Sequence, residues 1–218
     1  YYHLVLLAGT QAGYSQLVEL VSRAYTEGFY YKPRIDKELL AAHHEGLIGL
    51  SACIAGEIPS MILKGDMAAA ETSARAYVDI FGRDNFFIEL QDHGIPEQRE
   101  ANPKLVELAN KLGIGLVATN DIHYIDRADA DAHDVLLCIQ TGKCVEDVGR
   151  MRFSTQEFYM KTGEEMAQLF PGYPEALSNT CRIAERCQVE FEFGHLRLPD
   201  FPLPAGVTSD NYLRELCT

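Results

Sequence analysis

The 218-residue chain is 47% hydrophobic and 23% charged, an ordinary globular composition that excludes disordered, collagen-like and coiled-coil proteins. Its length allows one large domain or two small ones. Acidic residues outnumber basic ones 32 to 19, which gives a formal net charge of −13. This charge excludes a free-standing protein that binds nucleic acid through its overall field, because such binding needs Lys and Arg to displace counterions from phosphates.

The chain shows no sign of export or membrane insertion. No apolar run approaches the roughly 20 residues of a membrane span, and the N-terminal segment has neither the basic flank nor the cleavage pattern of a signal peptide. The six cysteines form no CxxC pair and no short-spaced framework, which predicts reduced thiols. We therefore expect a cytoplasmic protein that does not contact a membrane.

Short apolar runs that alternate with amphipathic stretches are the main structural signal. Continuous apolar runs predict buried strands at 4–8, 47–51, 86–90 and 116–119. Apolar stripes at helical spacing predict helices at 14–25, 36–45, 67–81 and 105–112. Gly113 follows the last of these as a C-terminal cap. The repeated order of strand and helix implies parallel strands joined by right-handed crossovers, and hence an α/β fold.

The pattern changes after about residue 127. Helices are predicted at 128–139, 163–170 and 175–187, and a short strand at 158–161. From His195 to Gly206 the prolines at positions 199, 202 and 204 predict an extended linker. Thr208 to Asp210 then predicts the N-terminal cap of a final helix.

Polar side chains follow three of the four predicted strands. They are Cys53 after the second strand, Asp92 and His93 after the third, and Asn120, Asp121 and His123 after the fourth. The carboxyl ends of parallel strands open on one side of a sheet, where sites are built. We therefore expect these side chains to converge in space.

The Asp121-x-His123 pair points most directly to metal binding. In an extended segment residues i and i+2 point the same way, and a carboxylate with an imidazole suits Zn, Mn or Fe. Cys53 adds a softer ligand that favours zinc. The alternative is structural, since an Asp at a strand end often caps a helix and His123 can be a partly buried histidine with satisfied hydrogen bonds.

Two further observations bear on function. The segment Tyr30-Tyr31-Lys32-Pro33-Arg34 mixes aromatic and basic side chains, which suits either contact with phosphates or a solvated loop. The chain has no Walker A, GxGxxG, GxSxG or HExxH sequence. Their absence disfavours a P-loop protein, a dinucleotide-binding protein and a serine hydrolase.

A series of ordered segments resembles one known family. The segments are HLVLLA (3–8), EGFYYKPR (27–34), LSAC (50–53), ELQDHG (89–94), ATNDIHY (118–124), AHDVLLCIQTGK (132–143), PEAL-x-NT (174–180) and IAERC (183–187). The family is the PHP (polymerase and histidinol phosphatase) domain at the N-terminus of the α subunit of bacterial DNA polymerase III. The resemblance covers essentially the whole chain.

This resemblance implies a distorted (βα)7 TIM-like barrel that holds a divalent metal cluster of up to three Zn, Mn or Fe ions. It implies metal ligation by His3, Cys53, Asp121 and His123. His93 would position phosphate or transfer a proton as a catalytic residue, with Asp92 beside it.

The opening His-x-His motif of the family and several further ligands are absent from the chain. The resemblance therefore implies that residues 1–194 are the C-terminal two-thirds of a PHP domain, without its first βα units. Residues 195–218 would be the proline-rich linker and the first helix of a polymerase body. The segment alone would then be inactive as a phosphoesterase.

Three functions follow from the resemblance. In the first, the parent is a DNA-directed DNA polymerase, a nucleotidyltransferase with its polymerising carboxylates beyond Thr218, and this region is a metal-dependent phosphoesterase that acts as a proofreading 3′–5′ exonuclease. In the second, the region is a catalytically silent scaffold that stabilises the polymerase and docks a proofreading subunit. The third is a stand-alone phosphatase, which the continuation through Asn211 to Arg214 disfavours. The implied partners are DNA, a proofreading exonuclease subunit and a sliding clamp.

Overall fold

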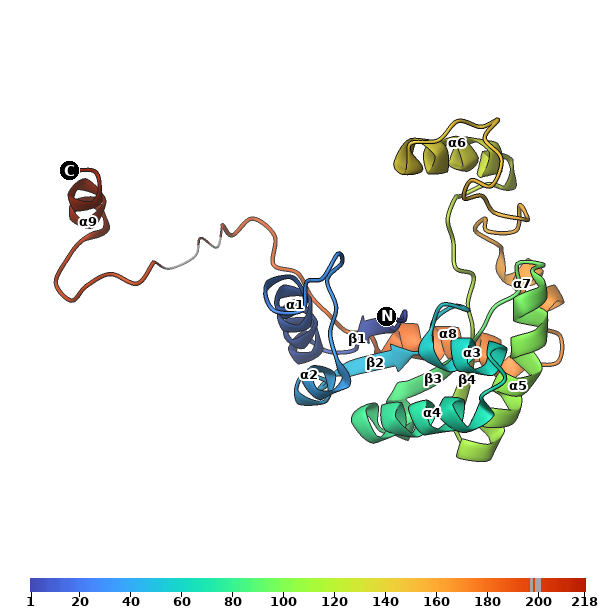
Figure 1. Cartoon of the computed structure of the whole chain (residues 1–218). Helices are drawn as coiled ribbons and strands as arrows, with labels where there is room; N and C mark the ends of the chain where they lie inside the picture. Colours follow the sequence, from blue (N-terminus) through green and yellow to red (C-terminus); the bar gives the residue numbers. More distant parts are fainter. Residues whose placement is uncertain (197, 199–200) are drawn as a thin grey trace.

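The computed structural model describes residues 1–196, 198 and 201–218, and it places helices around a four-stranded sheet in the order β1-β2-β3-β4 (Figure 1). The strands are β1 (Val5–Ala8), β2 (Leu47–Leu50), β3 (Phe86–Leu90) and β4 (Gly115–Ala118). All four lie where continuous apolar runs predict them. The predicted α/β class is confirmed.

Apart from the helix at 57–63, the helices overlap their predicted positions, although the helix predicted to start at residue 105 begins at Pro96. They are α1 (Gln11–Thr26), α2 (Lys37–Ala42), α3 (Glu57–Leu63), α4 (Met67–Phe81), α5 (Pro96–Leu112), α6 (Ala130–Thr141), α7 (Gly163–Leu169), α8 (Pro174–Arg186) and α9 (Ser209–Leu216), with short 3-10 turns η1 (Arg83–Asn85) and η2 (Arg127–Asp129). Gly113 caps α5 in the left-handed conformation, as predicted.

Two local predictions were wrong. Helix α3 was not predicted, because its seven residues are too few to show a helical period. The strand predicted at 158–161 is absent from the described residues, where Tyr159 forms only an isolated bridge to Tyr124. Its few β-forming residues find no neighbouring strand with which to form a ladder.

The direction of β1 also corrects the prediction of an all-parallel sheet. β2, β3 and β4 are parallel, but β1 pairs antiparallel to β2, with Val5 opposite Leu50 and Ala8 opposite Leu47. A continuous apolar run looks the same in either direction, so composition could not reveal the reversal. As a consequence, the start of β1 lies beside the carboxyl ends of the other three strands.

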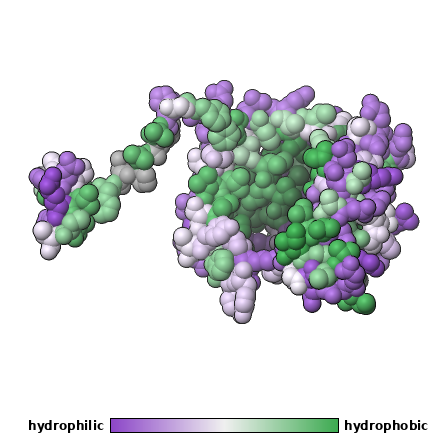
Figure 2. Space-filling model, turned by 90° about the horizontal axis from the view of Figure 1, so that it is seen from above, coloured by the Kyte–Doolittle hydropathy of each residue, from purple (hydrophilic) through white to green (hydrophobic). Residues whose placement is uncertain are grey.

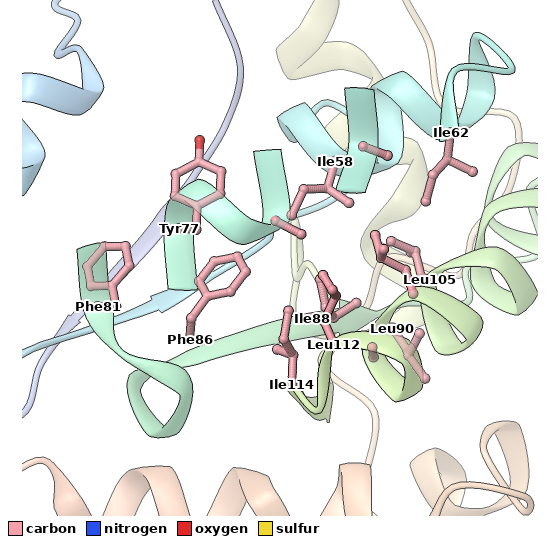
Figure 3. Packing of buried hydrophobic residues seen from close by; sticks show 14 of the residues in the cluster. Ile58, Ile62, Tyr77, Phe81, Phe86, Ile88, Leu90, Leu105, Leu112 and Ile114 are labelled. Carbon is pink, nitrogen blue, oxygen red and sulfur yellow. The ribbon is translucent and has the colours of Figure 1, made fainter. Parts of the chain in front are cut away.

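One face of the sheet carries the larger core. Phe86, Ile88 and Leu90 of β3 point to this face, where they meet α4 and α5, and Ile58 and Ile62 of α3 complete the cluster (Figure 3). The opposite face carries a smaller cluster around Phe87 and Val117, packed against Ile183 of α8. The strands are therefore apolar on both faces, as their continuous composition requires.

The sheet is open within the described residues, and a closed barrel is not seen. At one edge, Asn179 of α8 covers β4 by donating a hydrogen bond from Nδ2 to the Leu116 carbonyl, 2.7 Å away. At the other edge, β1 pairs only with β2 among the described strands. Figure 2 shows an apolar hollow in the face seen from above, where hydrophobic side chains remain accessible. Open edges and exposed apolar surface usually mark places where further chain packs.

The C-terminal segment extends away from the sheet and ends in α9, which is capped by Thr208 as predicted (Figure 1). Of the predicted linker, Pro202 and Pro204 lie in irregular structure, whereas Pro199 lies outside the described residues. Among the helices of the described residues, none has the length and apolar character needed to cross a membrane.

A part-buried carboxylate joins α3 to α4. Glu57 accepts hydrogen bonds from Lys37 (2.9 Å), Ser73 (3.0 Å) and Tyr77 (2.7 Å). Burial acts to raise the pKa of Glu57, but the hydrogen bonds from Lys37 and Tyr77 outweigh it, so the pKa lies below its ordinary value of 4.5. Such a carboxylate stabilises the fold above its unfolded pKa, and this stabilisation is lost as the pH falls through the folded pKa.

We expect Glu57→Gln to lower the free energy of unfolding by about 1–3 kcal/mol at neutral pH, because it weakens three part-buried hydrogen bonds. The variant should also lose less stability than the wild type between neutral pH and acid. Urea unfolding at a series of pH values measures both effects. Glu100→Gln is the control, since Glu100 makes an exposed i,i+4 pair with Lys104 and should change stability by less than about 0.5 kcal/mol. Equal losses in the two variants would contradict the role assigned to Glu57.

Candidate metal centre

A cleft of about 560 Å³ lies at the carboxyl ends of β2, β3 and β4, beside the start of β1. We call it the strand-end cleft. Its polar lining residues are His3, Cys53, Glu89, Gln91, Thr119 and Asp121. Three of the four predicted metal ligands therefore face one cavity, although they are far apart in sequence. His3 joins the others because β1 runs antiparallel to β2.

His3 and Cys53 bring an imidazole nitrogen and a thiol sulfur together in the cleft. Their Nδ1 and Sγ atoms are 3.6 Å apart, and the backbone N–H of His3 donates to the carbonyl of Ala55 at 3.0 Å, which holds the two segments together. The imidazole is exposed and the thiol is half-buried. Burial raises the pKa of the Cys53 thiol, and the carboxylates of Asp121 and Glu89 act in the same direction.

The backbone is strained on both sides of the cleft. Ala52 has a φ of 63° and Asp121 a φ of 33°, values that residues with a side chain rarely adopt. Such conformations cost on the order of 1–3 kcal/mol each and gather at functional sites, where the surrounding structure holds them. Here they turn the chain sharply after β2 and β4, directly before Cys53 and at Asp121 itself.

Glu89 is a polar residue of the cleft that sequence reasoning missed. Its carboxylate is 4% exposed, and Oε1 accepts hydrogen bonds from Thr119 (2.5 Å) and Gln91 (3.5 Å). Oε2 has no hydrogen-bond partner, and neither has Oε1 of Gln91. Burial raises the pKa of Glu89, against the effect of the Thr119 hydrogen bond. The available sequence signal was a single acidic residue inside the otherwise apolar strand FFIEL.

Asp121 and His123 do not point the same way. Asp121 lines the cleft, whereas the His123 ring lies among the aromatic rings of Phe153 (4.8 Å between centroids), Phe158 (5.5 Å) and His133 (5.8 Å). Its Nδ1 donates to the carbonyl of Asp121 at 2.8 Å. The left-handed backbone at Asp121 breaks the extended conformation on which the i, i+2 expectation relied. Metal ligation by His123 stays a prediction.

His93 lies in the interior, with both ring nitrogens engaged. Nε2 donates to the carbonyl of Asn120 and Nδ1 accepts from Gln98 Nε2, both at 2.8 Å. The ring stacks on Phe158 with centroids 4.2 Å apart, and burial lowers its pKa. This geometry is that of a neutral imidazole that positions the chain after β4. In this arrangement neither nitrogen is available to a phosphate.

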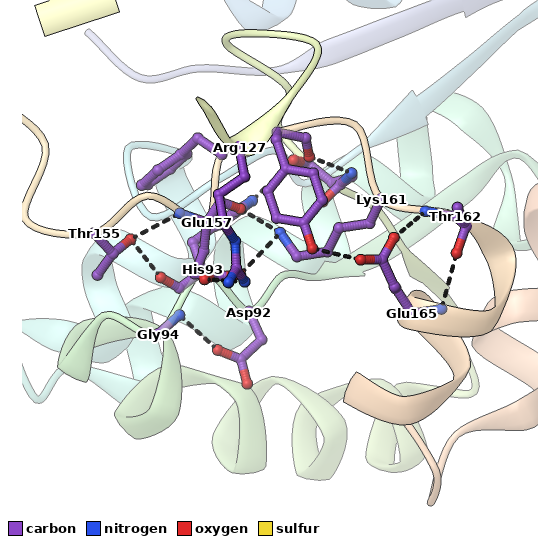
Figure 4. A network of polar contacts seen from close by, with 12 residues as sticks. Asp92, His93, Gly94, Arg127, Thr155, Glu157, Lys161, Thr162 and Glu165 are labelled. Atoms are coloured by element: carbon purple, nitrogen blue, oxygen red, sulfur yellow. Dashed lines mark hydrogen bonds and ion pairs between the residues drawn. The ribbon is translucent and has the colours of Figure 1, made fainter. Parts of the chain in front are cut away.

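Asp92 has a local role next to His93. Its Oδ1 accepts from the backbone N–H of Gly94 at 2.8 Å and closes a tight turn after β3. Figure 4 shows this turn beneath a polar network that holds the segment from Thr155 to Glu165 against it. Lys161, whose side chain is 2% exposed, donates to the carbonyl of Glu157, and burial lowers its pKa.

The side chains of the strand-end cleft are of the kinds that bind metal ions, but they are too few to hold an ion by themselves. Imidazole nitrogen, thiolate sulfur and carboxylate oxygen are the ligands that zinc prefers. Yet within the part of the chain that the structure describes, no three His, Cys, Asp or Glu side chains are grouped closely enough to hold an ion. The His3–Cys53 pair and the unpartnered Glu89 oxygen therefore fit one side of a centre that needs further ligands.

Comparison with known proteins finds a family match in the N-terminal part of the chain. Residues 1–93 match the family model described as the PHP domain. This segment includes β1 to β3 and carries His3, Cys53 and Glu89 of the strand-end cleft.

Individual proteins match the chain over nearly its whole length. It is 52% identical over 217 residues to DNA polymerase III subunit alpha of Treponema pallidum, covering 99% of this chain and 18% of that protein. It is 50% identical over 222 residues to the same subunit of Thermus aquaticus, again covering 99% and 18%, and 46% identical over 219 residues to that of Deinococcus radiodurans, covering 98% and 16%. The chain thus spans under a fifth of the length of these relatives.

The predicted resemblance is confirmed. The chain carries a match to the PHP domain and is homologous, along nearly its whole length, to one segment of DNA polymerase III α subunits.

Proposed function

We propose that the chain is part of a bacterial replicative DNA polymerase and that its strand-end cleft belongs to a metal-dependent phosphoesterase centre. One observation carries the second statement. His3, Cys53 and Asp121 face a single cleft together with a buried carboxylate oxygen of Glu89 that has no partner. A buried charge is costly unless it is paired or binds metal, so the orphaned oxygen favours a cation in the cleft.

The residues of the cleft would have two roles, metal ligation and orientation of the ligands. His3 and Cys53 would hold a divalent ion, zinc being the best match to a nitrogen–sulfur pair. Asp121 would supply an oxygen ligand, and Thr119 and Gln91 would orient Glu89 through their hydrogen bonds to its Oε1. Bound divalent ions supply water activation and stabilise the oxygens of a phosphodiester displacement. The further ligands would come from chain outside residues 1–218.

We also propose the domain arrangement that this requires. Residues 1–194 would be the larger part of a PHP barrel whose remaining strands pack in the apolar hollow beside β1, and residues 195–218 would lead into the polymerase body. The polymerising activity itself, with DNA, a sliding clamp and a proofreading subunit as partners, would belong to the longer cytoplasmic protein. The named relatives are polymerase subunits, which favours this over a stand-alone phosphatase.

Asp121→Asn in the full-length protein should lower metal-dependent 3′–5′ hydrolysis of a mispaired primer by more than about a hundredfold, because a neutral amide is a poor substitute for a charged ligand. Release of labelled mononucleotide, with and without added Zn or Mn, measures this activity. Asp92→Asn is the matched control, since its carboxylate faces a turn. Unchanged hydrolysis by the Asp121 variant would contradict the proposal.

A scaffold without catalysis is the second candidate function. It is favoured by the lack of a three-ligand group within the described residues and by the enclosed position of His93. If it is correct, removing metal with a chelator should lower the melting temperature of the polymerase while no nuclease activity is found in wild-type protein. Nuclease activity that tracks metal content would exclude it.

A further inference from the structure

The loop between α1 and α2, whose course Figure 1 shows, carries solvent-exposed tyrosines and a residue with positive φ. Tyr30 and Lys32 form an isolated antiparallel bridge, with the Tyr30 N–H donating to the Lys32 carbonyl at 3.1 Å. Tyr31, at the tip, has a φ of 61° and is 84% exposed. The Tyr31 ring packs edge-to-face against Tyr30, with centroids 4.6 Å apart, and otherwise faces solvent, so little burial offsets the strain. Such outliers point to a function for the side chain that is displayed.

Three cations in this region each lie over an exposed tyrosine ring and have no carboxylate partner among the described residues. Lys32 Nζ lies 5.3 Å from the centre of the Tyr1 ring, Arg34 lies 4.9 Å from that of Tyr30, and Lys64 lies 5.6 Å from that of Tyr2. In the described residues none of the three forms an ion pair. This contrasts with cations elsewhere, such as Arg23 beside Glu27 and Arg150 beside Asp134. The chain has a net charge of −13, so a group of cations without ion-pair partners is unusual in it.

A groove of about 870 Å³ is lined in part by Tyr1, Tyr2, Lys32 and Arg34. None of the carboxylates that line the groove pairs directly with Lys32 or Arg34. Asp36 caps α2 through the Leu39 N–H at 2.8 Å, Glu57 pairs with Lys37, and Glu38 is exposed. The groove and the strand-end cleft have Tyr2, His3 and Leu4 in common as lining residues.

We propose that this tyrosine–cation surface, formed by Tyr2, Tyr30, Tyr31, Lys32, Arg34 and Lys64, binds single-stranded DNA. Exposed rings offer faces on which unpaired bases stack, and unpaired cations beside them contact the phosphates between those bases. Stacking and phosphate contact are independent of base sequence. Duplex DNA fits poorly, because its base faces are already stacked. Homology to DNA polymerase subunits favours DNA over RNA as the strand that is bound. Binding needs no metal, so the proposal does not rest on the phosphoesterase function.

Photocrosslinking tests the surface in the full-length protein, where other regions also contact DNA. The probe is a single-stranded oligodeoxynucleotide that carries 5-iodouracil, irradiated in the presence of EDTA so that no hydrolysis intervenes. Mass spectrometry then identifies the crosslinked peptides. We expect a crosslink at Tyr30 or Tyr31, and a yield in that peptide at least about fivefold lower in Lys32→Gln/Arg34→Gln, because phosphate contacts are lost.

Two control variants match the exposure and charge of the test residues. Tyr25→Ala removes an exposed ring that stacks on Phe29 outside the surface, and Arg75→Gln removes a cation on α4 that pairs with Glu71. Neither should change the yield. Crosslinks confined to other regions would overturn the proposal, as would equal crosslinking by duplex DNA. A single-stranded RNA that crosslinks more strongly than DNA would overturn the choice of ligand.

Discussion

The double variant His3→Ala/Cys53→Ala should lose most of its bound zinc when the full-length protein is purified and its metal content measured by elemental analysis. The Nδ1 atom of His3 and the Sγ atom of Cys53 lie 3.6 Å apart in the strand-end cleft. Removing both takes away the nitrogen and the sulfur ligand at once. The remaining carboxylates of Glu89 and Asp121 are weak zinc ligands without them. Each single variant should lower the affinity by more than about tenfold.

The control for this experiment is His44→Ala/Cys181→Ala. It removes one imidazole and one exposed thiol that lie far from the cleft, at the end of α2 and on α8. Its zinc content should equal that of the wild type. Equal zinc loss in both variants would show that the metal binds non-specifically. Full zinc occupancy in the His3/Cys53 variant would place the metal centre elsewhere.

Phe86→Ala should give the largest loss of stability in the chain. Phe86 is fully buried at the start of β3, and its ring stacks on Tyr77 and Phe81 of α4 with centroids 5.1 and 6.1 Å away. Figure 3 shows these three rings at one end of the main core. Truncation leaves a cavity that both neighbours line, which costs about 3–5 kcal/mol. Thermal unfolding should show a fall of roughly 10 °C in the melting temperature.

Phe193→Ala is the corresponding control, because Phe193 is 87% exposed in the C-terminal segment. Its loss should change the free energy of unfolding by less than about 0.5 kcal/mol. Metal content should remain normal in whatever fraction of Phe86→Ala is folded, because Phe86 lies at the opposite end of β3 from Glu89 and the cleft. Similar stability of the two variants would mean that the stacked rings contribute little to the core.

The strand-end cleft is formed by strained turns after two strands and by the pairing of strands that are distant in sequence. The positive φ values at Ala52 and Asp121 turn the chain after two strands, and the reversed β1 brings His3 to the same edge. Glu89 enters from the strand between them and is held by Thr119 of the next. The cleft therefore depends on all four strands, and a substitution at one strand end should alter the positions of cleft residues at the others.

The sequence by itself determined the local features of this protein. Continuous apolar runs placed all four strands, stripes and capping residues placed most of the helices, and polar residues after the strands indicated Cys53 and Asp121. These features are local because a strand or a cap depends on neighbours a few residues away. The ordered motifs added the homology to polymerase α subunits.

Tertiary structure decided the rest. The antiparallel direction of β1, the unpartnered oxygen of Glu89 and the divergence of His123 from Asp121 all depend on contacts between residues tens of positions apart. A periodic pattern carries no information about the direction in which a strand enters a sheet, nor about which side chain finds a hydrogen-bond partner once it is buried. Pairing and burial are properties of the assembled sheet, so the position of the cleft could be predicted from the sequence but its geometry could not.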